Sequence, residues 1–571
     1  MKKINIKYIA LVICLSVFTT NCNDFIEETP ESVFSVGEFY SNAQEAKFAL
    51  AGIYSRFAGG SMYGRDYLTR LSTGADEIYY NQRFNSNWTI STLTHTEADS
   101  RVHNFWLNMY RGINLANLFE ANLKQSAFSE IQANQFLAES RFLRAFAYFH
   151  LVSWFEEVPL RLEPTNTFED NHVAPASLEQ VYEQIISDFK FAAQHLPHLT
   201  DTNYELGRAH KMSAEGLLAR VYLKMAGYPL KDTSKYQLAK DQCEIVMNDG
   251  NHGLTTGGND PLGDNGYRNH FLSYIQNRFD TRESLFEIVF SSLREEDFVE
   301  VGGRVGVDHG PSHKTLGGVD LSPFAFMSIT PMLIDLYDDN DLRKAWNIPE
   351  FYFVRRSGSS AGNIRKPNVL TVSNNPGKFR RWEPANYADL NVNPSASDPD
   401  EEIVYLETAE PDRNISSINY PILRYSDILL MYAEADLEIN GTPTAEAIAA
   451  LNQVRNRAGL INIQDANPTI VSNKQFFFNE LVDERSRELC FESLRKMDLI
   501  RWELFDDKIS ELVDVVRGHP EYNDNPASSG NDLHESFIKA GKNFIPGKHL
   551  SLPYPLQETL INDELNQKPN W

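Results

Sequence analysis

The stretch YYNQRFNSNW at positions 79–88 brings aromatic rings, amides and a guanidinium together. An aromatic ring can stack on the apolar face of a sugar, and amides or arginine can bond its hydroxyls. The same mixture would suit a peptide. The candidate ligand-binding residues here are Tyr80, Asn81, Arg83 and Trp88. The alternative is a loop whose aromatic rings pack down on neighbouring helices.

A similar mixture recurs in the second half of the chain. RRWEPANY at 380–387 again combines aromatic rings with arginine and an amide, and the segment 304–326 has a comparable texture. We therefore add Trp382 and Tyr387 to the candidate ligand-binding residues.

The strongest signatures of catalysis and metal binding are missing. The sequence has no Walker loop, HExxH or CxxC motif. The acidic turn at 338–341 offers oxygen ligands for calcium, but a helix end followed by an N-cap explains it better. The loop acids Asp249, Asp260 and Asp264 leave calcium binding open. We predict no enzyme activity, no cofactor and no metal site.

Overall charge restricts the partners. The formal net charge of −25 argues against nucleic acid, whose phosphates are held by lysine and arginine. A ligand should be neutral, cationic, or bound away from the acidic surface. Aromatic residues make up 12% of the chain, which leaves rings available for a binding surface.

The N-terminus has the pattern of an export signal. Lys2, Lys3 and Lys7 precede an apolar run from Tyr8 to Phe18, far short of the about 20 apolar residues that span a bilayer. Cys22 follows this run directly and is the predicted site of lipidation. The alternative is ordinary cleavage nearby, which would leave Cys22 as a thiol.

Two cysteines remain for the folded body, since Cys14 lies inside the signal. An exported location permits a disulfide between Cys243 and Cys490. However, Cys490 sits in a helix-like run, so we predict two separate buried thiols.

Helical periodicity dominates the first half of the chain. In SAEGLLARVYLKMAG, apolar residues recur every three or four positions, and several other runs share this pattern. Their Ala, Leu and Tyr content is typical of tetratricopeptide-like helix pairs without a strict repeat. Residues 248–266 are rich in Gly, Asn and Asp and predict a loop. Residues 282–419 are loop-rich with short strands such as SLFEIVF, and helices return at about Ile422.

The run from Phe477 to Leu504 is predicted to be one helix that carries many charged side chains. Asp483 with Arg487 and Glu492 with Lys496 have the spacing of helical ion pairs. We interpret these residues as a solvated charged face rather than as catalytic carboxylates.

Ordered motifs over nearly the whole chain resemble the SusD/RagB family. They include CNDFIEETPES after the lipoprotein cysteine, STGADEIYY, FLAESRFLRAFAYFHLVSWFEEVPL, YPILRYSDILLMYAEADLEING and LVDERSRELCFESLRKMDLIRWE. Two departures are Glu156-Glu157, where the family often has Gly before Val-Pro, and Ser493, where Gly is common after Phe-Glu.

The resemblance implies a mainly α-helical superhelical body with tetratricopeptide-like helix pairs and a loop-rich ligand-binding part. By position it adds Asp76, in STGADEIYY, to the candidate ligand-binding residues. The predicted divisions are a signal peptide (1–21), an acidic lipid-anchored tether (22–32), an N-terminal helical region (33–247), a loop-rich connection (248–281) and a C-terminal region with ligand-binding loops (282–571).

The resemblance also implies a location and a role. It predicts an outer-membrane lipoprotein that faces the cell exterior and passes oligosaccharides to a SusC-like TonB-dependent transporter. Capture of peptides is the variant within this class. The alternatives from other classes are a surface glycoside hydrolase, which needs a pair of carboxylates across a cleft, and a helical scaffold that binds only protein.

Overall fold

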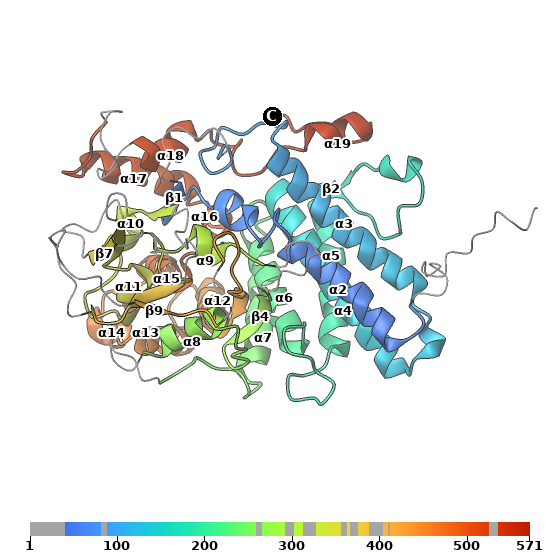
Figure 1. Cartoon of the computed structure of the whole chain (residues 1–571), viewed down its shortest axis with the longest axis horizontal. Helices are drawn as coiled ribbons and strands as arrows, with labels where there is room; N and C mark the ends of the chain where they lie inside the picture. Colours follow the sequence, from blue (N-terminus) through green and yellow to red (C-terminus); the bar gives the residue numbers. More distant parts are fainter. Residues whose placement is uncertain are drawn as a thin grey trace, which may run out of the picture.

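The structure is a computed structural model that describes residues 40–80, 88–257, 265–291, 302–311, 327–355, 362–365, 375–387, 403–408, 412–524 and 535–571. Helices form most of the described chain, as predicted (Figure 1). None of the helices within these ranges combines the length and apolar character needed to cross a membrane.

The first half of the chain is an array of helices in which each packs on the next. The array contains α2 (Ala43–Ala58), α3 (Ser100–Asn122), α4 (Glu130–Phe155), α5 (Leu178–His195), α6 (Lys211–Ala226) and α7 (Lys235–Met247). Polar side chains begin these helices. Asn42 caps α2, Ser129 caps α4, and Ser177 forms a capping box with Gln180 at the start of α5.

The array continues with helices from the C-terminal part. Helix α12 (Tyr425–Asn440) packs against α6 and α7, and α13 (Ala445–Arg457) and α15 (Lys474–Leu489) pack against α12. At Gly216 in α6, an added Cβ would lie 2.5 Å from Leu423 Cδ2 and 2.9 Å from Ile428 Cδ1. The absence of a side chain there lets α6 approach α12 closely.

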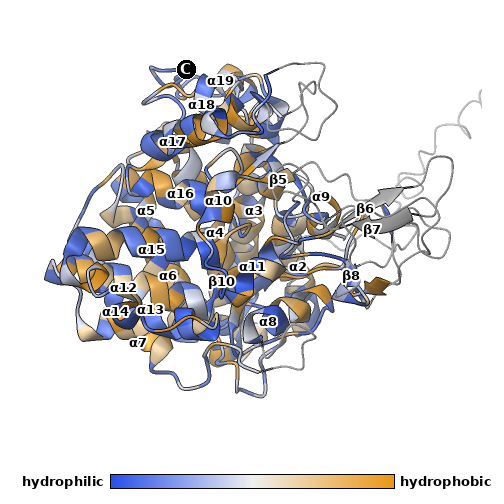
Figure 2. Ribbon diagram, turned by 90° about the vertical axis from the view of Figure 1, so that its left-hand side faces the viewer, coloured by the Kyte–Doolittle hydropathy of each residue, from blue (hydrophilic) through white to orange (hydrophobic). Residues whose placement is uncertain are grey.

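Short antiparallel pairs of strands replace an extended sheet in the described chain. The pairs are β1 (Ile78–Tyr80) with β5 (Met327–Ile329), β2 (Val158–Pro159) with β3 (Pro175–Ala176), β4 (Ser284–Ile288) with β10 (Tyr420–Arg424), β6 (Tyr352–Arg355) with β7 (Gly362–Arg365), and β8 (Trp382–Pro384) with β9 (Ile403–Tyr405). The predicted strand SLFEIVF is therefore confirmed as β4. In Figure 2, β8 lies on the right-hand side of the molecule, and α12 and α15 lie on the left-hand side.

Short helices complete the loop-rich part and the end of the chain. They are α8 (Gly266–Ile275), α9 (Val305–Asp308), α10 (Pro331–Asp335), α11 (Leu342–Asn347), α14 (Ile463–Ala466), α16 (Arg495–Arg501), α17 (Phe505–Gly518), α18 (Lys539–Asn543) and α19 (Leu556–Ile561). Helix α8 lies inside the connection predicted to be loop-rich. Tyr267, Phe271 and Tyr274 are buried on one face of this helix. Their spacing is helical, but the neighbouring Gly-, Asn- and Asp-rich loop led to the prediction of a loop here.

Two smaller predictions are confirmed. Cys243 and Cys490 are separate, buried thiols. In the acidic turn at 338–341, the Asp341 carboxylate accepts a hydrogen bond from Arg343 N at 2.9 Å and caps α11.

Among the described residues, no group of three or more His, Cys, Asp or Glu side chains is placed to hold a metal ion. Asp260 and Asp264 lie outside the described residues.

Both departures from the resembled motifs occur where the backbone is left-handed. Glu156 has φ 60° and ψ −116° at the C-terminus of α4, and Ser493 has φ 63°. Glycine adopts such conformations without a steric penalty. Ser493 has a compensating role, because its Oγ lies 2.8 Å from Tyr420 Oη and 3.0 Å from Ser72 Oγ.

Glu156→Gly should therefore raise the free energy of unfolding by about 1 kcal/mol, since it relieves an unfavourable φ/ψ combination. Urea denaturation followed by tryptophan fluorescence measures the change. The matched control is Glu157→Gly, whose φ is not positive and which should give no gain. Equal effects of the two substitutions would contradict the argument.

Candidate functional site

The first predicted ligand-binding stretch is only partly described. Tyr80 ends β1, which pairs with β5 so that Tyr80 lies opposite Met327. Asn81 and Arg83 fall in 81–87, outside the described residues.

The described rings of this stretch lie inside the protein. Trp88 is 3% exposed, and its ring stacks on Tyr80 with centroids 3.8 Å apart and planes 12° apart. The Arg70 guanidinium lies 4.8 Å from the centroid of the Trp88 ring. Tyr80 and Trp88 therefore pack inward, which is the alternative that the sequence left open. Their contact with a ligand stays a prediction.

Asp76 is held by an arginine from the far end of the chain. Its carboxylate accepts hydrogen bonds from Arg495 Nε at 2.8 Å and Nη2 at 2.6 Å, and the residue is 5% exposed. Thr330 Oγ1 donates to the Asp76 carbonyl. This bidentate ion pair joins the segment before β1 to α16, which gives Asp76 a structural role.

The neighbouring Glu77 has an unusual environment. It is 3% exposed, its Oε1 accepts a hydrogen bond from Phe491 N at 3.3 Å, and its Oε2 has no partner among the described residues. Burial raises the pKa of Glu77 to about 8, although nearby Arg495 opposes the shift. The folded protein therefore holds this carboxyl protonated at neutral pH, whereas the unfolded chain ionises it near its ordinary pKa of 4.5.

Stability should consequently fall as the pH rises from about 4.5 to 8, because the unfolded state loses this proton first. Glu77→Gln cannot ionise and keeps the acceptor for Phe491. We expect the variant to be more stable than the parent by about 2 kcal/mol at pH 8.5 and to differ little at pH 4.5. Urea denaturation at both pH values tests this, and an equal difference at the two pH values would refute it.

The second predicted pair is brought together by a third ring. Trp382 is 1% exposed, and its Nε1 donates to the Pro311 carbonyl at 3.1 Å. Tyr387 is half-buried, and its hydroxyl donates to Glu383 Oε2 at 3.0 Å. Phe351 contacts both rings, with centroids 5.1 Å from Trp382 and 5.8 Å from Tyr387. The three rings form a small core of their own, and ligand contact by Trp382 and Tyr387 stays a prediction.

The prediction of a solvated charged helix at 477–504 is wrong. The helix is interrupted, since α15 ends at Leu489 and α16 begins at Arg495. Glu492 pairs with Lys378 and Arg424 rather than with Lys496. The charges are buried because the surrounding loops and α11 cover this side of the helix, which spacing along one helix cannot reveal.

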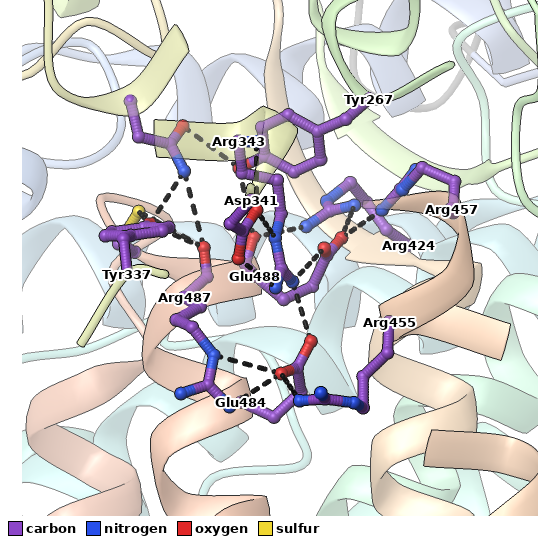
Figure 3. Close-up of polar contacts among 12 residues, drawn as sticks. Tyr267, Tyr337, Asp341, Arg343, Arg424, Arg455, Arg457, Glu484, Arg487 and Glu488 are labelled. Carbon is purple, nitrogen blue, oxygen red and sulfur yellow. Dashed lines mark hydrogen bonds and ion pairs between the residues drawn. The ribbon is translucent and has the colours of Figure 1, made fainter. Parts of the chain in front are cut away.

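Arg424 and Glu492 belong to a buried cluster of arginine and acidic side chains. Figure 3 shows the polar contacts around its centre. Its members are Glu283, Asp341, Arg343, Arg424, Arg455, Arg457, Glu484, Arg487, Glu488 and Glu492, and each is at most 9% exposed. Glu488 lies at its centre. It accepts from Arg343 Nη1 at 3.1 Å and Arg424 Nη1 at 3.0 Å, and it also pairs with Arg457.

The cluster contains several carboxylates, as an acid–base catalytic site would, but the carboxylates of Glu484 and Glu488 do not hold a proton near neutral pH. Burial alone would raise the pKa of Glu484, but Arg343 and Arg487 outweigh burial and lower it to about 2. The same balance, with Arg457 and Arg424, lowers the pKa of Glu488 well below its usual range. A glycosidase needs a carboxylic acid that keeps its proton near neutral pH. Glu484 and Glu488 are ionised and fully occupied by guanidiniums, so they serve the fold.

A groove of about 510 Å³ is open at the opposite end of the helical array, between α3, the connection at 159–171 and α19. In Figure 1, α19 lies beside α3 near β2. Tyr110 Oη donates to the Pro159 carbonyl at 2.8 Å, and Asn117 Nδ2 donates to the Arg161 carbonyl at 3.1 Å. These bonds fix the connection on α3.

The far wall of the groove is the end of the chain. Leu556 N donates to the Glu97 carbonyl at 2.9 Å, and Asn562 Nδ2 donates to the Val173 carbonyl at 2.8 Å. The groove thus stands on described, hydrogen-bonded elements.

Sequence reasoning missed this groove, although a signal exists. Trp106, Tyr110, Asn114 and Asn117 recur at helical spacing and place aromatic rings and amides along one side of α3. The same periodicity is typical of a helix that packs in an array, so it does not by itself distinguish a groove wall from a buried face.

Comparisons with known proteins extend over nearly the whole chain. A family model described as the SusD family matches residues 283–571, and another, described as starch-binding associating with outer membrane, matches residues 24–223. SusD-like protein P25 of Formosa agariphila is 26% identical over 564 residues, 95% of each chain.

Solved structures agree. A SusD homologue from Bacteroides thetaiotaomicron is 26% identical, with a TM-score of 0.77 over 94% of this chain and 98% of that one. A laminarin-binding SusD-like protein is 25% identical, with a TM-score of 0.67 over 93% of this chain and 100% of that one.

Proposed function

Because the chain belongs to the SusD family, we propose that it is a non-catalytic, cell-surface nutrient-binding lipoprotein that captures oligosaccharides. The observation that carries this proposal is the likeness over nearly the full length to SusD-like proteins, one of which binds laminarin. The carboxylates of the buried cluster are held by guanidiniums, which agrees with capture without cleavage.

Calorimetric titration of the full chain in detergent against plant, host and microbial oligosaccharides and mixed peptides tests the proposal. We expect saturable binding of at least one oligosaccharide, and chromatography should recover that ligand intact. Cleaved ligand would overturn the non-catalytic assignment. Binding of peptides alone would make the protein a peptide-capturing member of the family.

The anchor is proposed to be a lipid on Cys22, which follows the predicted signal directly. The family model that matches residues 24–223 carries a description of association with the outer membrane, which supports this location. Cys22→Ala should abolish palmitate labelling and release the protein from the membrane fraction. Labelling that survives the substitution would move the anchor elsewhere.

The proposed partner is a SusC-like TonB-dependent transporter that receives the captured ligand. Cross-linking of the full chain in outer membranes, followed by mass spectrometry, should recover such a transporter. Recovery of no transporter in membranes that retain the lipidated protein would refute this partner.

A further inference from the structure

The groove between α3 and α19 presents three guanidiniums. Arg56, Arg111 and Arg161 line it. The Nε atoms of Arg56 and Arg161 are buried without a hydrogen-bond partner among the described residues. Arg111 is exposed and makes no ion pair within the described chain. Two carboxylates, Glu163 and Glu558, also line the groove, so positive charge is in excess there although the whole chain carries −25.

Amide groups add to the supply of donors. Asn114 Oδ1 accepts a hydrogen bond from Thr165 N at 2.9 Å, and Asn171 Oδ1 accepts one from Arg161 Nη1 at 3.0 Å. The amide oxygens of Asn114 and Asn171 are therefore occupied. Their NH₂ groups make no hydrogen bond within the described chain and can donate to a ligand in the groove. An acceptor-rich ligand matches this lining.

Much of the remaining lining is apolar. Leu107, Ile113, Pro159 and Ile561 provide aliphatic surface between the polar groups. A volume of about 510 Å³ falls within the range of about 300–1,000 Å³ typical of small-molecule sites. Apolar walls with a few convergent polar groups suit a ring that has an apolar face and polar edges.

We infer that this groove is a binding site for an acidic saccharide, whose carboxylate or sulfate groups are held by Arg56, Arg111 and Arg161. The inference rests on the proposed function, because it names the class of oligosaccharide and a site for it. Guanidiniums bind carboxylate and sulfate oxygens with charge-assisted hydrogen bonds.

A saccharide fits the lining better than an acidic peptide does. Each peptide unit brings an N–H donor that also needs an acceptor, and Glu163 and Glu558 are the only side-chain carboxylates that line the groove in the described chain. Sugar hydroxyls can donate or accept as required. The excess of donors therefore favours sugar oxygens and anionic substituents.

The test is calorimetric titration of the full chain in detergent with matched probes. An oligogalacturonate is compared with its neutral methyl ester, and a sulfated galactan oligosaccharide with its unsulfated form. Polyglutamate is the peptide probe. The variant is Arg56→Gln with Arg111→Gln, and the control is Arg278→Gln, which removes an exposed guanidinium outside the groove. Thermal melting verifies that each variant is folded.

We expect at least one acidic probe to bind more tightly than its neutral partner. The groove variant should weaken that binding about tenfold or more, and Arg278→Gln should leave it unchanged. Added salt should reduce the preference for the acidic probe. Hydrogen exchange should slow at 159–171 and 556–562 in the parent protein when the acidic probe is bound.

Other outcomes overturn the inference in distinguishable ways. Equal binding of an acidic probe to the parent and the groove variant would place the site elsewhere. Binding of neutral probes alone would refute the acidic class and leave the proposed function intact. Binding of polyglutamate in place of the saccharides would assign the groove to a peptide. Failure of every saccharide, in this panel and in the broader one above, would refute the proposed function as well.

Discussion

Glu488→Gln is expected to lower the free energy of unfolding by about 3–5 kcal/mol, one of the two largest effects we predict for a single substitution. Glu488 is fully buried and is paired with Arg343, Arg424 and Arg457. Glutamine keeps the shape of the side chain but removes the negative charge. Three buried guanidiniums would then share fewer counter-charges, which costs far more than the loss of an exposed ion pair.

Urea denaturation at pH 7 measures this loss. The matched control is Glu183→Gln, an exposed glutamate on α5, which should change the free energy by no more than about 0.5 kcal/mol. If Glu488→Gln costs less than 1 kcal/mol, the cluster does not hold the fold as argued.

Acid should reproduce the effect of the substitution. Glu484 has a pKa of about 2 in the folded protein and 4.5 as its ordinary value. The stabilisation is therefore complete above pH 4.5 and is lost as the pH falls toward 2. The parent protein should lose more stability over this range than Glu488→Gln, because part of the cluster is already uncharged in the variant.

Asp76→Leu is expected to cost about 3–5 kcal/mol, because it leaves Arg495 buried without its carboxylate partner. The double variant Asp76→Leu with Arg495→Met removes both charges and should recover a large part of that loss. Denaturation of the parent, the two single variants and the double variant gives the coupling free energy. Additive effects of the two substitutions would contradict a structural ion pair.

The same variants decide between the two roles considered for Asp76. If the residue only holds the fold, the folded double variant should bind its oligosaccharide with the parent affinity. A large loss of affinity in a stably folded double variant would instead support the ligand contact that the resemblance implied.

The helical body and the family could be predicted from the sequence because their signals are local. The periodicity of residues 213–227, for example, identifies α6 without knowledge of its neighbours. Burial of polar residues could not be predicted in the same way. Glu488 and Trp88 have the composition of a solvated face and an open loop, and only their partners from distant segments show that both are inside.

The candidate site was predicted less well for a related reason. Tyr80 stacks on Trp88, and Trp382 and Tyr387 both contact Phe351, but in the described chain these rings pack against the protein. The groove is built from α3, residues 159–171 and α19, which are far apart in the sequence. The helical spacing of Trp106 and Tyr110 was visible, but the segments that turn this helix face into a groove were not.

The pairing of Asp76 with Arg495 also constrains the order in which the chain can fold. The two residues are 419 positions apart, whereas α2 to α7 each contact the next helix along the chain. Short-range contacts form early, and contacts that close long loops wait for their partners. The helices of the first half can therefore assemble early, while Asp76 stays solvated until α16 docks against it. The tie between the segment before β1 and α16 is thereby a late contact, although β1 can already pair with β5 once residues 327–329 are in place.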